Sequence, residues 1–164
     1  MKTILVLCTG NSARSILGEA ILNSQGAGRV RAYSAGSQPK GQPHQGALRL
    51  LTSKGIDSAA FRSKSWGEFA EPGAPAIDIA ITVCGNAAGE VCPVFIGAPI
   101  RAHWGLPDPA EVTGKDEDID SAFAETWALL DMRVRALLAL PFETMDALDL
   151  RAALNKIGAM EGAA

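Results

Sequence analysis

The sequence predicts an α/β fold in which helices cover both faces of a parallel sheet. Two observations lead to this prediction. Continuous apolar runs at residues 3–7 and 77–83 have the pattern of strands that are buried on both faces. Segments with apolar residues at helical spacing lie between such runs, and strands that alternate with helices pair in parallel.

The elements can be placed in chain order from their apolar periodicity and their stop signals. The second helix stops at Gly55, and Pro141 ends the long helix, which has the clearest helical spacing in the chain. Stretches 71–76 and 85–99 are expected to be loops, and a loop as long as the second is often functional. The predicted elements are strand 3–7, helix 15–25, strand 30–35, helix 44–54, strand 77–83, helix 118–139 and helix 146–157.

Size, charge and cysteine content narrow the class of protein. The 164 residues suffice for one domain, and a net charge of −3 gives no electrostatic case for binding nucleic acid or an anionic membrane. The N-terminal apolar run is too short for a signal peptide, and no stretch is long enough to span a bilayer. We therefore expect a cytoplasmic protein whose three cysteines form no structural disulfide framework.

The strongest chemical signal is segment 8–15, Cys-Thr-Gly-Asn-Ser-Ala-Arg-Ser, between the first strand and the first helix. A loop at this place can turn backbone N–H groups inward as a nest for an anion, and the helix N-terminus adds a positive dipole end. Arg14 supplies a planar fork for two oxygens of a tetrahedral anion, and these neighbours should depress the pKa of Cys8. The predicted oxyanion ligands are Thr9, Gly10, Asn11, Ser12, Ala13 and Arg14.

Other residues of this segment have expected supporting roles. Gly10 allows a backbone angle that other residues resist, and Asn11 tolerates a left-handed conformation and can brace the loop with its amide. Ser15 can donate its hydroxyl to the sulfur of Cys8. The competing interpretation is a buried cysteine followed by an ordinary strand-to-helix turn, because Cys and Arg occur at this spacing by chance.

Segment 8–15, with Glu19 after it, resembles the phosphate-binding loop of the low molecular weight protein tyrosine phosphatases and of the arsenate reductases that share their fold. The resemblance extends over residues 1–140. It implies three layers, with a four-stranded parallel sheet between helices, which matches the element order. We therefore predict a domain at 1–140, followed by a C-terminal helical extension at 141–164 that packs on it or serves a contact.

Segment 103–110 resembles the arsenate reductase segment that places the general acid. This resemblance implies that Asp108 protonates the leaving oxygen, and a carboxylic acid is the expected partner for a thiolate nucleophile. The alternative is a plain Asp-Pro turn. Phosphatases of this fold usually carry aromatic residues after the Asp-Pro pair to grip a phosphotyrosine ring. Ala110, Glu111 and Val112 stand there instead, which weakens the phosphatase interpretation.

The resemblance to thioredoxin-coupled arsenate reductases also implies a cascade through Cys84 and Cys92. Cys8 attacks arsenate, and Cys84 then attacks Cys8 and releases arsenite. Cys92 moves the disulfide to Cys84–Cys92, and a thioredoxin-like reductant reopens it. A related branch uses glutathione or a similar small thiol with a glutaredoxin-like protein, and the sequence does not decide between them. Position 13 is Ala, where many thioredoxin-coupled reductases carry another cysteine.

These two cysteines also have passive interpretations. Cys84 closes a predicted strand, where a buried thiol can act as a small hydrophobic side chain, and Cys92 can be an ordinary loop residue. Their spacing is not a typical zinc pattern, and no metal site is predicted. A phosphatase has no chemical need for either thiol, whereas a reductase needs a source of two electrons.

Some reductases of this family bind potassium beside the loop, through residues that match Asn11, Glu19 and Ser34. The last ligand of the family is an acid, and the matching position here is Lys64. A lysine ammonium near Glu19 would fill the same charge role without a metal, so we predict no potassium requirement and no other cofactor. The alternative is that Glu19 and Lys64 are ordinary solvated charges.

The leading hypothesis is therefore reduction of arsenate, with phosphate or sulfate as mimics of the substrate. The catalytic residues would be Cys8, Arg14, Ser15, Asp108, Cys84 and Cys92. A phosphomonoester hydrolase of the tyrosine phosphatase type is the main alternative. A third interpretation is a module without catalytic activity that binds oxyanions and exchanges disulfides with a partner.

Overall fold

The protein is described by a computed structural model that covers residues 1–85, 89 and 93–162. Its centre is a four-stranded parallel sheet with strand order β2-β1-β3-β4. This confirms the predicted fold class. The strands are β1 (Lys2–Cys8), β2 (Val30–Gly36), β3 (Ile79–Thr82) and β4 (Ile100–His103).

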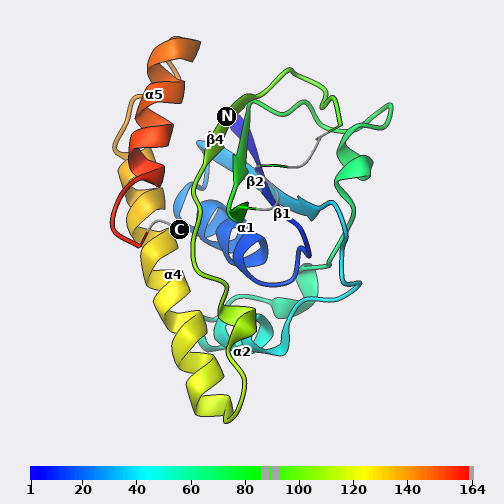
Figure 1. The fold of residues 1–164 in the computed structure, drawn as a ribbon. Coiled ribbons are helices and arrows are strands. Elements are labelled where there is room, and N and C mark those ends of the chain that lie inside the picture. Colours follow the sequence, from blue (N-terminus) through cyan, green and yellow to red (C-terminus); the bar gives the residue numbers. More distant parts are fainter. Residues whose placement is uncertain (86–88, 90–92, 163–164) are drawn as a thin grey trace.

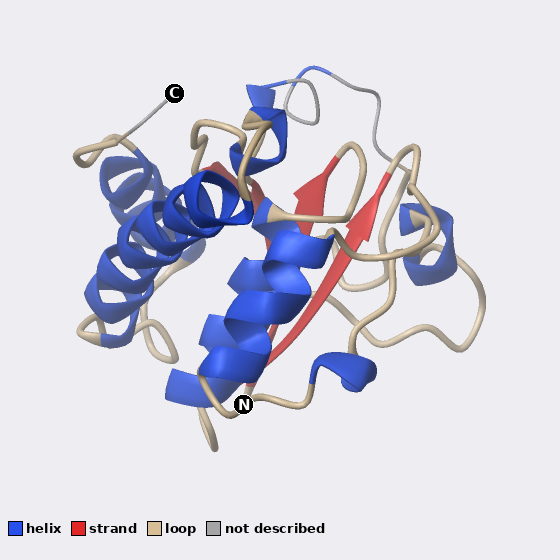
Figure 2. Ribbon diagram, turned by 90° about the horizontal axis from the view of Figure 1, so that it is seen from below, coloured by secondary structure: helices blue, strands red, loops and turns tan. Residues whose placement is uncertain are grey.

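Helices follow the strands, so that strand and helix alternate through most of the chain (Figure 1). In the described residues the α-helices are α1 (Arg14–Gln25), α2 (Gln45–Ser53), α4 (Asp116–Leu138) and α5 (Ala147–Gly158). Three short 3-10 helices, η1 (Ser58–Ala60), η2 (Trp66–Phe69) and η3 (Pro109–Glu111), stand in the connections. Figures 1 and 2 show α4 and α5 side by side along one flank of the molecule.

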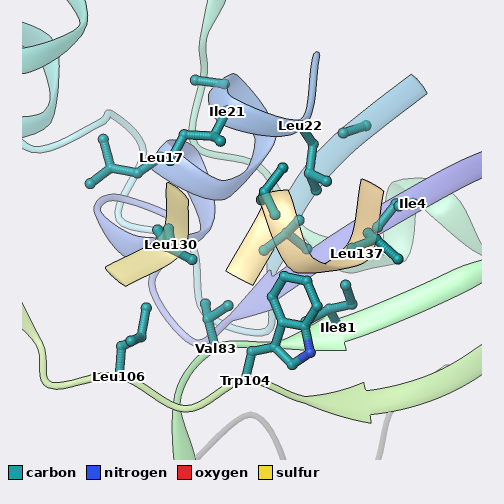
Figure 3. Packing of buried hydrophobic residues seen from close by; sticks show 14 of the residues in the cluster. Ile4, Leu17, Ile21, Leu22, Ile81, Val83, Trp104, Leu106, Leu130 and Leu137 are labelled. Atoms are coloured by element: carbon teal, nitrogen blue, oxygen red, sulfur yellow. The ribbon is translucent and has the colours of Figure 1, made fainter. Parts of the chain in front are cut away.

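Strand β1 is buried on both faces because its side chains alternate between two apolar clusters. Ile4 and Val6 belong to the larger cluster, to which α1, α2, α4 and α5 all contribute (Figure 3). Leu5 and Leu7 belong to a smaller cluster on the opposite face, together with Phe69 of η2. This arrangement explains the continuous apolar run, since a strand with one solvated face would alternate with polar residues.

Each element predicted from periodicity is present, with ends that differ by at most two residues from those expected. Residues 71–76 form a loop, as expected. Strand β4 was not recognised from its own residues. It has four residues, pairs with β3 alone among the described strands, and carries the exposed Arg101, so its apolar signal is weak and its pairing is a tertiary effect. Stretch 85–99 lies partly outside the described residues.

The described part of the C-terminal extension packs against β4 and α4. The indole Nε1 of Trp104 donates to the carbonyl oxygen of Leu154 at 2.9 Å. Arg29 holds the start of the extension, because its Nε donates to Glu143 Oε2 at 2.6 Å and its guanidinium lies over the ring of Phe142. The division of the chain at residue 140 stays a prediction. In the described part of the chain, no helix is long and apolar enough to cross a membrane.

Replacing Gly158 with Ala should weaken the docking of α5. A Cβ atom there would overlap the carbonyl oxygen of His103 and lie 2.9 Å from Trp104 Cδ1. We expect the free energy of unfolding to fall by about 2 kcal/mol, measured by urea denaturation. Arg151→Ala, on an exposed position of the same helix, is the control and should change it by less than about 0.5 kcal/mol. Equal effects of the two substitutions would contradict this close contact.

Candidate active site

The loop between β1 and α1 borders a cavity of about 220 Å³ at the carboxyl end of the sheet. Ligands of open α/β proteins bind at this edge. Parallel pairing places Cys8 beside Gly36 of β2, and Leu7 beside Thr82 of β3, so segments that follow three strands meet here. The cavity is lined by Cys8, Thr9, Gly10, Ser12, Ala13, Arg14, Gln38, Lys40, Cys84 and Asp108.

Asn11 holds the loop in shape. Its backbone is left-handed, with φ of 44°, and its side chain is buried. The amide Nδ2 donates to Ser15 Oγ at 2.8 Å, and Oδ1 accepts from the backbone N–H of Lys64 at 2.9 Å. Asn tolerates this conformation better than most residues, so the predicted bracing role is confirmed. Donation from Ser15 to Cys8 stays a prediction.

The reason expected for Gly10 is wrong, because Gly10 is not among the residues with positive φ. A side chain at Gly10 would instead approach Lys40, since a Cβ atom would lie 3.2 Å from Lys40 Cε. Gly36 leaves even less space for a side chain, and no pattern in the sequence indicates this. A Cβ atom there would overlap the carbonyl oxygen of Thr9 and lie 2.7 Å from that of Cys8. A side chain at Gly36 would therefore push β2 away from the loop.

Segment 38–44 supports the loop from one side. The N–H groups of Gln38, Lys40 and His44 donate to the carbonyl oxygens of Thr9, Gly10 and Ser12 at 2.9, 3.0 and 2.9 Å. The C=O and N–H of one peptide unit point in opposite directions, so the N–H groups of Gly10, Asn11 and Ala13 point away from this segment. Their part in binding an anion stays a prediction. His44 itself caps α2, because its Nδ1 accepts from the N–H of Gly46 at 2.9 Å.

Arg14 and Asp108 lie side by side in the lining of the cavity. One terminal nitrogen of Arg14, NH1, donates to the carbonyl oxygen of Leu106 at 2.8 Å, and the other, NH2, lies 3.4 Å from Asp108 Oδ2. Arg14 Nε is buried without a hydrogen-bond partner among the described residues. Asp108 also caps η3, because Oδ1 accepts from the N–H of Ala110 at 3.0 Å. Asp108 therefore forms the expected Asp-Pro turn and also places a carboxyl group in the lining of the cavity. Its role as an acid stays a prediction.

Cys84 follows β3 and lies next to Cys8. Both thiols are buried, they are hydrogen-bond partners of each other, and Thr9 Oγ1 lies 3.6 Å from Cys84 Sγ. Cys84 lines the cavity together with Cys8, and its redox role stays a prediction. The pairing arises because β1 and β3 are neighbours in the sheet. The third residue of the expected cascade, Cys92, lies outside the described residues.

The expectation of a depressed pKa for Cys8 is wrong for this arrangement. The hydrogen bond with Cys84 and burial of the sulfur raise the pKa of Cys8. Arg14 and the backbone N–H of Gly10 lower it, but they do not outweigh the other two. The cations and N–H groups near the sulfur can be read from the sequence, whereas the loss of water and the second thiol arise only in the folded protein.

Glu19 and Lys64 form a buried pair behind the loop rather than two solvated charges. Each residue is 8% exposed, and Lys64 Nζ lies 3.7 Å from Glu19 Oε1. Burial raises the pKa of Glu19, although the Lys64 ammonium opposes this shift. Burial lowers the pKa of Lys64. Because an ammonium already stands beside Glu19, these residues do not fit a potassium ion.

Two residues of the cavity rim, Gln38 and Lys40, were not expected from the sequence. Neither stands in a recognisable motif, and they reach the site because their segment bonds to the loop. Among the described residues, no group of three or more His, Cys, Asp or Glu side chains could hold a metal ion.

Comparisons with known proteins agree on one family. A family model described as low molecular weight phosphotyrosine protein phosphatase matches residues 3–150. An arsenate reductase of Bacillus licheniformis is 35% identical over 135 residues, which cover 82% of this chain and 87% of that protein. An arsenate reductase of Halalkalibacterium halodurans is 35% identical over 134 residues, with the same two shares. A solved structure of an arsenate reductase in the phosphate binding state has a TM-score of 0.67 and 26% identity, over 85% of this chain and 98% of that one.

Replacing Lys64 with Met should leave the buried Glu19 carboxylate without a counter-charge. We expect the free energy of unfolding to fall by about 3 kcal/mol at neutral pH. The folded-state pKa of Glu19 is raised, so the stabilisation from protonating Glu19 is fully present below pH 4.5 and is lost as pH rises through the folded-state pKa. The loss should therefore shrink as pH falls towards 4.5 in urea denaturation series.

The double variant Glu19→Gln/Lys64→Met is the control for this experiment. It has no buried charge at the pair, so it should recover most of the lost stability and its pH dependence should be small. A loss in Lys64→Met that is below about 0.5 kcal/mol and independent of pH would show that the two charges are solvated.

Replacing Cys84 with Ala should make Cys8 more reactive. The Cys84 thiol is the largest cause of the raised pKa of Cys8, so its removal should lower that pKa. We expect alkylation of Cys8 by iodoacetamide at neutral pH to accelerate about tenfold, followed by mass spectrometry over a range of pH. Both proteins should carry Cys92→Ser, so that Cys8 is the thiol that is followed. Slower alkylation in the variant would mean that Cys84 promotes the thiolate.

Proposed function

This chain belongs to the low molecular weight phosphotyrosine protein phosphatase family, and we propose that it reduces arsenate to arsenite. The contact between the Cys8 and Cys84 thiols, in a cavity that also holds Arg14 and Asp108, carries this proposal. Hydrolysis of a phosphate ester needs one nucleophilic thiol. Reduction of arsenate needs two, because two electrons must leave the protein as a disulfide forms.

The cavity suits a small tetrahedral oxyanion. Its volume of about 220 Å³ is ample for such an anion, and Arg14 and Lys40 bring positive charge to it in a protein of net charge −3. Arg14 Nε has no partner among the described residues, so it is available to an oxygen of the substrate. The backbone N–H groups of residues 9–14 are the remaining proposed donors, and phosphate or sulfate should compete for them.

In the first step, the sulfur of Cys8 attacks the arsenic of bound arsenate. As the sulfur–arsenic bond forms, the Cys8 thiol gives up its proton. This proton passes through Asp108, beside Arg14, to the departing hydroxyl, which leaves as water. A sulfur–arsenic bond has then formed, and arsenic is still in the oxidised state.

In the second step, Cys84 attacks the sulfur of Cys8. A Cys8–Cys84 disulfide forms, the sulfur–arsenic bond breaks, and its electron pair stays on arsenic, which leaves as arsenite. The contact of the two thiols supports this step, because little movement is needed to bring the attacking sulfur into line.

The disulfide must be reduced again before another turnover. We propose that Cys92 accepts it and that a thioredoxin-like protein then reopens Cys84–Cys92, with glutathione and glutaredoxin as the alternative source of electrons. A cytoplasmic location is part of the proposal, since Cys8 and Cys84 must be reduced to react. No step needs potassium, because Lys64 holds the charge beside Glu19.

A phosphotyrosine phosphatase fits the cavity less well. Ala110 and Glu111 of η3 follow Asp108, and no aromatic residue is among the described residues that line the cavity. A phosphotyrosine ring would therefore lack the flat apolar contacts that grip it. Slow hydrolysis of a phosphate ester is compatible with the reductase proposal, because the same loop accepts either anion.

The test is arsenite production from arsenate by the wild-type protein and by Cys84→Ala. The wild type should give many turnovers, whereas the variant should lose at least about a hundredfold because it cannot release arsenite from Cys8. Val83→Ala is the control, since Val83 packs in the larger apolar cluster and does not line the cavity. Undiminished arsenite production by Cys84→Ala would contradict the proposal, as would ester hydrolysis without any arsenite.

The same assay with two reductant systems tests the last step. One tube holds thioredoxin with its reductase, and the other holds glutathione with glutaredoxin. We expect turnover with thioredoxin, and we expect Cys92→Ser to abolish it. Turnover only with glutathione and glutaredoxin would retain the reductase and remove Cys92 from its cycle.

A further inference from the structure

Arg133 of α4 is a completely buried cation without an acidic partner among the described residues. Its NH1 atom donates to the carbonyl oxygen of Trp104 at 3.0 Å and to that of Gly105 at 3.1 Å. Its Nε and NH2 atoms are buried and have no partner in the described part of the chain. Most of the donors of this guanidinium are therefore unused.

Stability alone does not account for this side chain. A buried charge costs free energy unless it is paired, and an apolar side chain of similar volume at such a place is often neutral or stabilising. Two hydrogen bonds to neutral carbonyl groups offset only part of that cost. The role of Arg133 therefore depends on the segment that contains the carbonyl groups of Trp104 and Gly105.

They belong to the segment that leads from β4 to Asp108. The N–H of Trp104 donates to the carbonyl oxygen of Thr82 at 2.7 Å, and the N–H of Leu106 donates to that of Val83 at 3.2 Å. Trp104 and Leu106 reach into the larger apolar cluster (Figure 3). The N–H groups are thus tied to β3 and the residue after it, whereas the carbonyl groups depend on arginine side chains.

Two arginines on different helices donate hydrogen bonds to three successive backbone carbonyl groups. Arg133 binds those of residues 104 and 105, and Arg14 binds that of Leu106. Arg14 also lies 3.4 Å from Asp108, two residues further along. Any shift of segment 104–106 would therefore move Asp108 relative to the guanidinium that binds the substrate.

We propose that Arg133 is a positioning residue, which holds segment 104–106 so that the Asp108 carboxyl reaches the oxyanion bound at Arg14. The inference rests on the proposed function for the role of Asp108. Arg133 does not line the cavity, and it acts through the backbone of segment 104–106. Since an acid displaced by about 1 Å loses much of its effect, Arg133 influences proton transfer to the leaving oxygen rather than binding of arsenate.

Arsenate turnover by Arg133→Met tests this role. Met keeps an apolar side chain of similar length and donates no hydrogen bond. We expect kcat to fall roughly 10- to 100-fold with little change in KM for arsenate. Arg135→Met is the matched control, because Arg135 is two residues further along α4, is exposed and pairs with Asp131. It should stay within about twofold of the wild type.

Repeating Arg133→Met in an Asp108→Asn background separates an effect on the position of Asp108 from a general loss of folded structure. If Arg133 acts through Asp108, its loss should cost less than about twofold once the acid is gone. An equal loss in both backgrounds would overturn the proposal. Where Arg133→Met does not fold, Arg133→Lys replaces it, with a smaller loss that depends on Asp108 in the same way.

Hydrogen exchange provides a readout that is independent of arsenate reduction. Amide groups in residues 104–111 should exchange faster in Arg133→Met than in the wild type and in Arg135→Met, as followed by mass spectrometry. Unchanged exchange there would overturn the proposal. If the wild type makes no arsenite with any reductant but exchange accelerates as expected, the proposed function fails and the positioning of the segment stands.

Discussion

The position of β1 between β2 and β3 is the constraint on which the rest of the site depends. Parallel pairing brings the carboxyl ends of all three strands to one edge, so Cys8, Gly36 and the residues after Thr82 meet there. Cys8, the proposed nucleophile, is the last residue of β1, and Cys84 follows shortly after the end of β3. Helix α1 then begins at Arg14, after the short loop that follows Cys8. Sheet topology therefore determines which thiol Cys8 can contact.

Buried cations hold the polypeptide around this edge although the protein is acidic overall. Lys64 of the segment before η2 and Arg133 of α4 are buried, and Arg14 at the start of α1 is half-buried. All three donate to backbone carbonyl oxygens, at Leu106, Arg62, and Trp104 with Gly105. Backbone carbonyl groups in loops need partners when they are buried, and long basic side chains supply them. The irregular segments of the site are thus ordered by side chains from regular elements.

The contact between two thiols has opposite effects on the two halves of the proposed reaction. Hydrogen bonding with Cys84 and burial raise the pKa of Cys8, which disfavours the thiolate that attacks arsenate. The same closeness favours disulfide formation, because the second sulfur is already in reach. A protein that only hydrolysed phosphate esters would gain nothing from this compromise. In a reductase, easier formation of the Cys8–Cys84 disulfide compensates for the smaller fraction of Cys8 thiolate.

The sequence by itself determined the order of the strands and helices other than β4, the place of the loop between β1 and α1, and the bracing role of Asn11. These are local properties, since they depend on apolar periodicity and on the backbone preferences of single residues. The tertiary structure alone decided the pairing of β4, the constraint on Gly36, the burial of Glu19 with Lys64, and the raised pKa of Cys8. Each of these depends on segments far apart in the chain that exclude water from one another, and a single sequence does not record such distances.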